Sequence, residues 1–85
     1  MKEPSLVSLD RFASGGCGIV RELHGGADFV GRLAGMGLTK GTRIEVLQNA
    51  SHGPVLVRAH ESRIALGRGE AAKILVEKTD APSAP

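Results

Sequence analysis

The side chains of this sequence that could bind a metal ion are few and scattered along the chain. Thiol, imidazole and carboxylate groups are the usual protein ligands of iron and zinc. The candidates are Cys17, His24, His52, His60, Glu61 and Glu70. None of them forms the C-x-x-C or H-x-x-x-H spacing that preorganises a metal site. We therefore predict no metal site, retain His52, His60 and Glu61 as weak candidates, and interpret these three as exposed polar residues.

Nucleophilic catalysis also lacks a recognisable set of residues. The single thiol, Cys17, follows two glycines, and no basic residue neighbours it in the sequence. A reactive cysteine needs a base or a positive charge that stabilises its thiolate, so we interpret Cys17 as a small core or edge residue. The glycine-rich run at residues 15–18 lacks the G-x-x-x-x-G-K-[ST] pattern of a phosphate-binding loop. We predict a protein that is not an enzyme, has no cofactor and does not bind GTP itself.

Apolar and basic residues gather in one segment, and this favours binding to a partner protein. The candidate contact residues are Phe29, Arg32, Met36, Leu38 and Lys40. Burial in the chain's own core competes with contact, and we expect Val30, Leu33 and Leu38 to pack on the rest of the domain. Arginine and methionine are enriched at interfaces and lysine is depleted, which favours Arg32 and Met36 over Lys40. A weaker second surface contains Leu66, Arg68, Arg58 and His60.

Alternating apolar residues between turn signals predict an all-β domain. Period-two alternation bounded by Gly, Pro and Asn is typical of short strands. We predict five to six strands, at residues 5–9, 17–24, 43–48, 55–60, 63–66 and 73–77. Residues 70–72 are expected to form a 3₁₀ turn before the last strand. This pattern predicts a small, partly open barrel.

A change of period after the second strand predicts one short helix, at residues 27–35. Val30, Leu33 and Ala34 follow the i, i+3, i+4 spacing of a helix face. Asp28 is expected to cap the start of the helix. At its end, Gly37 is expected in the left-handed conformation, with the next residue folding back onto the last turn.

Length and composition limit the chain to one small domain. The 85 residues are 41% hydrophobic and include two Phe but no Trp or Tyr, so the core must be aliphatic. We predict a single domain at residues 1–78 and a disordered tail at residues 79–85. No apolar run reaches the ~20 residues that span a bilayer, and the single cysteine favours the cytoplasm. The net charge of +2 is spread along the chain and is not typical of a nucleic-acid surface.

Four segments in register carry a family resemblance that covers about residues 6–77. They are R-L-A-G-M-G-L-T-K-G-T at residues 32–42, G-P-V at 53–55, I-A-L-G-R at 64–68, and A-A-K-I-L-V at 71–76. In order and spacing they resemble the FeoA family of ferrous iron transport proteins. The resemblance implies an SH3-like barrel in the bacterial cytoplasm. It also implies an accessory to FeoB, the membrane ferrous iron transporter, through the transporter's GTP-binding domain.

The expected function is therefore a cytosolic accessory protein of ferrous iron uptake that binds and modulates FeoB. A partner would recruit it to the inner face of the membrane without insertion, and weak self-association stays open. The first alternative is a metal-binding or metal-sensing module that responds to Fe²⁺ or Zn²⁺. The second alternative is a small-barrel nucleic-acid binder, although such barrels usually stack bases on aromatic side chains that are scarce here.

Overall fold

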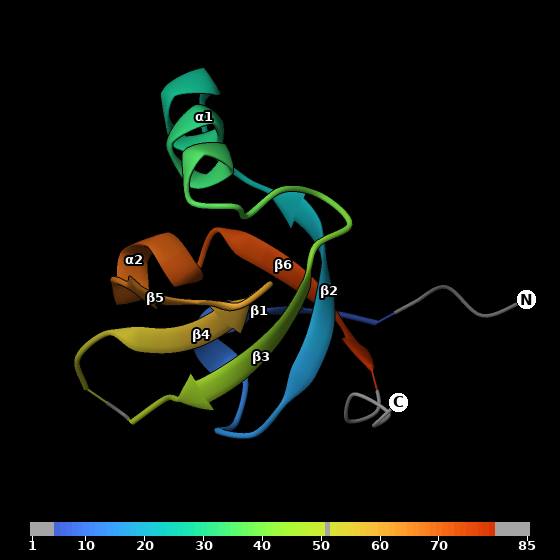
Figure 1. Cartoon of the computed structure of the whole chain (residues 1–85), viewed down its shortest axis with the longest axis vertical. Coiled ribbons are helices and arrows are strands. Elements are labelled where there is room, and N and C mark those ends of the chain that lie inside the picture. Colours follow the sequence, from blue (N-terminus) through green and yellow to red (C-terminus); the bar gives the residue numbers. More distant parts are fainter. Residues whose placement is uncertain (1–4, 51, 80–85) are drawn as a thin grey trace, which may run out of the picture.

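The computed structural model describes residues 5–50 and 52–79, which form six strands, two helices and one 3₁₀ turn (Figure 1). The predicted all-β architecture and its six strands are confirmed. In chain order the elements are β1 (Leu6–Ser8), η1 (Leu9–Arg11), β2 (Cys17–Leu23), α1 (Ala27–Gly35), β3 (Arg43–Gln48), β4 (Val55–Ala59), β5 (Ser62–Leu66), α2 (Arg68–Ala71) and β6 (Ile74–Thr79).

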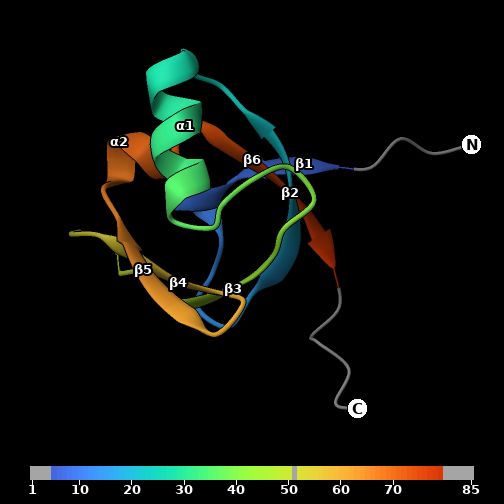
Figure 2. The ribbon, with the colours of Figure 1, turned by 45° about the horizontal axis from the view of Figure 1, so that its top comes forward.

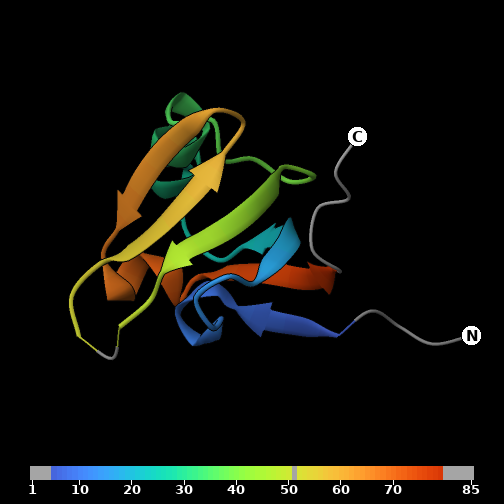
Figure 3. The same cartoon turned by 60° about the horizontal axis from the view of Figure 1, so that its bottom comes forward.

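The six strands form one antiparallel sheet in the order β1-β6-β2-β3-β4-β5. Two register shifts bend it, one in β2 between Val20 and Glu22 and one in β3 between Val46 and Gln48. Such irregularities increase the local twist of a sheet. The twisted sheet wraps around its own inner face, with β1 and β5 at its two borders (Figure 3).

The inner face of the sheet carries an aliphatic core, as the composition predicts. Alternate residues of β3 and β4 are buried, including Ile44, Val46, Val55 and Val57. The helix and the 3₁₀ turn contribute Leu33 and Leu9, both fully buried. Burying one such side chain stabilises the fold by about 1.5 to 3 kcal/mol. The further members of the cluster are Phe12, Val20, Phe29, Leu38, Ala59, Ile64, Leu66, Ala71, Ile74 and Val76.

Helix α1 stands beyond the ends of β2 and β6 and lies over one end of the barrel (Figures 1 and 2). Its predicted end is confirmed, because Gly37 has a φ of 91° and the Leu38 N–H donates to the Leu33 carbonyl at 2.9 Å. The predicted cap is wrong. Gly26 is the N-cap residue, while Asp28 lies inside the first turn, where its charge still complements the positive end of the helix dipole.

The helical turn before the last strand differs in type from the predicted 3₁₀ turn. Residues Arg68–Ala71 form one turn of α-helix, because the Ala71 and Ala72 N–H groups donate to the carbonyls of Gly67 and Arg68 at 2.9 and 3.0 Å. The Glu70 carboxylate accepts the Gly67 N–H at 3.3 Å and holds the start of this turn. The 3₁₀ turn of this fold lies instead after β1.

Strand β6 continues one residue beyond the predicted domain boundary. Thr79 pairs with Cys17 of β2 and is part of the sheet, not of the predicted tail. Backbone pairing with a central strand explains the difference, because it does not depend on an apolar side chain at that position. The rest of the predicted tail lies outside the described residues.

Candidate functional site

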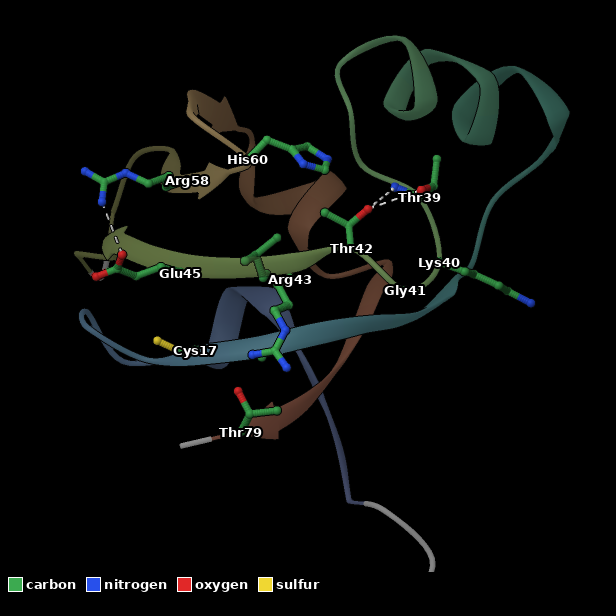
Figure 4. A pocket seen from close by; sticks show the side chains of 12 residues that line it. Cys17, Thr39, Lys40, Gly41, Thr42, Arg43, Glu45, Arg58, His60 and Thr79 are labelled. Carbon is green, nitrogen blue, oxygen red and sulfur yellow. Dashed lines mark hydrogen bonds and ion pairs between the residues drawn. The ribbon is translucent and has the colours of Figure 1, made fainter. Parts of the chain in front are cut away.

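A groove of about 780 Å³ crosses the outer face of the sheet (Figure 4). Strands β2, β3 and β4, the end of β6 and the loop at residues 39–42 form it. The side chains that give it its chemical character are Cys17, Thr39, Arg43, Glu45, Arg58 and His60. Sequence reasoning did not group these residues, because the strand register brings them together from distant positions.

The charges in the groove are mainly positive. Arg58 Nη1 lies 3.5 Å from Glu45 Oε1, and both side chains are partly exposed. Arg43 extends toward Cys17 and Thr79 (Figure 4), and its side chain is exposed. Lys40 lies at the rim of the same groove. One carboxylate therefore stands against three basic side chains in the lining, which makes the groove attractive to anions.

Cys17 is buried at the base of the groove, in agreement with its interpretation as a core or edge residue. Burial raises the pKa of the Cys17 thiol, and the negative charge of Glu45 raises this pKa further. Both causes disfavour the thiolate, which is the reactive form of cysteine. Cys17 therefore lacks the lowered pKa that is typical of reactive cysteines.

His60 begins the tight turn between β4 and β5 and has a φ of 59°. Positive φ is uncommon for a residue other than glycine. The imidazole ring lies beside Gly37 at the end of α1, where a Cβ would be 3.4 Å from His60 Cδ2. The turn therefore links the β4–β5 hairpin to the end of the helix.

The predicted partner surface divides into buried and exposed residues. Leu38 is fully buried and Phe29 is 8% exposed, so both belong to the core and leave the candidate surface. Met36 is 37% exposed, and the Arg32 and Lys40 side chains are also exposed. These three residues stay candidates for partner contact.

Val30 was expected to pack on the barrel, and this expectation is wrong. Its side chain is 36% exposed, while Leu33 is fully buried as predicted. The helix packs through one narrow face, in which Phe29 and Leu33 are four residues apart. Val30 lies beside that face and adds to the exposed apolar surface of α1.

The ring of Phe29 packs against the backbone at Gly25 and lies close to two basic side chains, and these contacts explain its burial. A Cβ on Gly25 would lie 2.7 Å from Phe29 Cγ, so only glycine lets the ring approach the backbone there. Lys73 Nζ and Arg32 Cζ lie 5.4 and 6.0 Å from the ring centroid, within the range of cation–π attraction. Arg32 also donates to Glu70 at 2.8 Å and so joins α1 to α2.

The potential metal ligands do not converge in the described ranges. Within residues 5–50 and 52–79, no group of three or more His, Cys, Asp or Glu side chains could hold a metal ion. His52, His60 and Glu61 are exposed, as expected. His24 contacts Glu22 at 2.5 Å, and Glu70 is engaged by Arg32. The prediction that the protein holds no specific metal stays a prediction.

The weaker second surface is mostly structural. Leu66 is fully buried. Arg68 is half-buried and donates hydrogen bonds to Asn49 Oδ1 and to the carbonyls of Asp10 and Ala50, at 2.8 to 3.0 Å. Arg58 and His60, in contrast, are exposed and line the groove. Sequence reasoning did not identify the structural role of Arg68.

Neither helix in the described part of the chain is long and apolar enough to cross a membrane.

Comparison with known proteins identifies the family of the chain. A family model described as the FeoA domain matches residues 7–78. A protein of Methanocaldococcus jannaschii named Fe(2+) transport protein A is 39% identical over 62 residues, which are 73% of this chain and 74% of the relative.

Solved structures agree with this assignment. A crystal structure of an iron uptake regulatory protein (FeoA) has a TM-score of 0.84 at 35% identity, over 88% of this chain and 100% of that chain. The zinc complex of Stenotrophomonas maltophilia FeoA, described as an SH3 domain protein, has a TM-score of 0.69 at 24% identity. That likeness covers 84% of this chain and 89% of the other and concerns the fold alone. The chain therefore belongs to the FeoA domain family, and its barrel has the SH3-like fold.

Proposed function

We propose that this protein is a cytosolic accessory of ferrous iron uptake that binds and modulates a FeoB-type transporter through its GTP-binding domain. Membership of the FeoA domain family and a relative named for Fe(2+) transport support the link to iron uptake. Recruitment by the transporter would bring the protein to the inner face of the membrane.

The observation that carries the proposal is the position of the exposed apolar residues. Val30 and Met36 are the exposed large hydrophobic side chains of the described residues, and both lie on α1 or at its end. Arg32 and Lys40 add exposed positive charge beside them. Apolar side chains next to arginine are typical of protein interfaces. The helix stands beyond the end of the barrel (Figure 2), so a partner can reach it.

A heteronuclear NMR titration with the GTP-binding domain of the FeoB from the same genome tests this proposal. The titration should be run with and without a non-hydrolysable GTP analogue. We expect amide shifts concentrated on residues 28–40, because α1 and the following loop carry the exposed apolar and basic groups. Dependence of the shifts on the nucleotide would indicate regulation.

Variants make the titration specific for the helix. Met36→Ser and Val30→Ser each remove exposed apolar surface, and we expect each to weaken binding several-fold. Ala65→Ser is the matched control, because Ala65 is exposed on β5 and lies outside residues 28–40. Absence of shifts in both nucleotide states would overturn direct recognition of that domain, and titration with Fe²⁺ or Zn²⁺ would then test the metal-sensing alternative.

A further inference from the structure

A row of side chains crosses the outer face of the sheet from β6 to β5. The register pairs Thr79 with Cys17, Cys17 with Glu45, Glu45 with Arg58, and Arg58 with Arg63. Residues paired across antiparallel strands place their side chains on the same face. The row therefore contains one carboxylate and two guanidinium groups on one surface.

The two arginines in this row, Arg58 and Arg63, repel each other electrostatically. Arg58 and Arg63 are directly paired on β4 and β5, and like charges in such pairs destabilise a sheet. Glu45 offsets only Arg58. Within residues 5–50 and 52–79, no carboxylate lies within ion-pair distance of Arg63. An anion supplied from outside would turn this repulsion into attraction.

The groove beside these arginines extends the positive surface. Lys40 and Arg43 line it together with Arg58, and Arg63 continues it onto β5. Three basic side chains thus line the groove against the single carboxylate of Glu45, whereas the whole chain has eleven Lys and Arg to nine Asp and Glu. Positive charge is therefore concentrated here well beyond the average of the chain.

The dimensions of the groove fit a short extended peptide. It crosses β6, β2, β3 and β4, and three interstrand spacings of about 4.8 Å amount to about 14 Å. An extended chain covers about 3.3 Å per residue, so about four residues fit across the groove. Its volume of about 780 Å³ is far larger than a single inorganic anion needs. Its lining contains no Phe, Tyr or Trp ring on which a nucleotide base could stack, and the imidazole of His60 is the one ring among its lining side chains.

We propose that this groove docks an extended, acidic segment of a partner protein, whose carboxylates bind Arg43, Arg58 and Arg63. The threonine hydroxyls at residues 39 and 79 lie along the same groove and offer hydrogen bonds to the peptide backbone. This surface shares Lys40 and its loop with the candidate surface at α1, but Arg43, Arg58 and Arg63 lie outside that surface. The inference therefore stands independently of the proposed partner at the helix.

Binding of a synthetic peptide tests the proposal directly. The probe is a blocked hexapeptide of alternating Glu and Val, titrated into the full chain and followed by amide shifts in NMR. A peptide of alternating Lys and Val is the matched control. We expect saturable shifts at groove residues with the acidic peptide only, and weaker affinity at high salt because the contacts are between exposed charges.

Charge reversal then identifies the contact residues. Arg43→Glu and Arg63→Glu should each lower the affinity for the acidic peptide about ten-fold, because each changes an attraction into a repulsion. Arg11→Glu is the control, since Arg11 is exposed but lies outside the groove. The double variant Arg43→Glu, Arg63→Glu should gain affinity for the Lys-Val peptide. Arg43→Gln provides a milder change if the Glu variant fails to fold.

Several results would overturn the proposal. Equal weakening by Arg11→Glu would indicate attraction to the net charge of the protein and not to the groove. Inorganic phosphate that reproduces the same shifts and displaces the peptide would indicate a simple anion site. Tighter binding of a single-stranded oligonucleotide would indicate a nucleic-acid surface. Lack of saturable shifts at about 1 mM peptide would exclude docking of such a segment. Each of these outcomes leaves the test of the helix surface unaffected.

Discussion

Arg68 donates from Nη1 to the side-chain oxygen of Asn49 at 2.9 Å. Through Nη2 it also reaches the carbonyl of Asp10 at 3.0 Å. Asn49 donates from Nδ2 to the same Asp10 carbonyl and to that of Phe12, at 2.9 and 2.6 Å. The two side chains therefore tie α2, the β3–β4 loop and the segment after β1 together. This network links elements near the two borders of the sheet by side chains.

Replacement of Arg68 should destabilise the fold. Arg68→Ala leaves several carbonyls without their donor, and we expect a loss of about 2 to 3 kcal/mol in the free energy of unfolding. For a domain of this size, 1 kcal/mol corresponds to about 4 to 8 °C in Tm. Arg68→Lys should recover only part of the loss, because an ammonium group lacks the planar fork. Thermal unfolding followed by circular dichroism measures both, with Arg11→Ala, at an exposed arginine, as a control that should change Tm little.

Replacement by alanine should change the stability of the fold in opposite directions at Gly18 and Gly31. A Cβ on Gly18 would overlap the Val76 side chain and lie 2.7 Å from the Glu77 carbonyl oxygen. Gly18→Ala should therefore lower stability by about 1 to 3 kcal/mol. No atom lies within 4 Å of a Cβ on Gly31 in α1, so Gly31→Ala should raise stability by about 1 kcal/mol. Urea unfolding of both variants checks this pair, and equal effects would contradict the packing described for β2 and β6.

The end of α1 should be sensitive to the residue at position 37. Gly37 has a φ of 91°, and an L side chain in this region costs about 1 to 2 kcal/mol. Gly37→Ala should lower the free energy of unfolding by about that amount. Gly37→Asn should cost less, because asparagine tolerates this conformation better than alanine. Denaturant unfolding of the two variants measures the difference, and an alanine variant as stable as the parent would contradict the left-handed helix end.

The raised pKa of the Cys17 thiol should lower the stability of the fold in alkaline solution. Burial and Glu45 raise the pKa of the thiol in the folded state above its ordinary value of 9.0. At a pH above about 9 the unfolded chain loses this proton more readily than the folded one, so stability falls as the pH rises toward the folded-state pKa. Unfolding measured from pH 7 to pH 10 should show this decline, and Cys17→Ala should reduce it. An unchanged slope in the alanine variant would assign the decline to other groups.

The sequence was sufficient for the strands, the helix and the turn that ends it. Alternation placed Ile44 and Val46 on the inner face, and Gly37 followed by Leu38 marked the end of α1. These features depend on neighbours in the chain, so local patterns contain the necessary information. The family resemblance added the SH3-like fold, and the comparisons confirm it.

Features that depend on contacts between residues distant in the chain could not be predicted from local sequence patterns. Phe29 is buried because Gly25 admits its ring, and Val30 is exposed because only one narrow face of α1 meets the barrel. The role of Arg68 depends on carbonyls of distant segments. The groove likewise needs the register of four strands, which alternation alone does not specify.

The pairing of Leu6 with Glu77 places the start of the first strand beside the last one. The chain therefore enters and leaves the barrel at the same border of the sheet, as is common in domains that tolerate fusion or insertion. A host protein could accept this barrel within a surface loop without stretching either connection. Circular permutation that joins these ends with a short linker and opens the β3–β4 loop should likewise preserve the barrel, except where it disturbs Asn49.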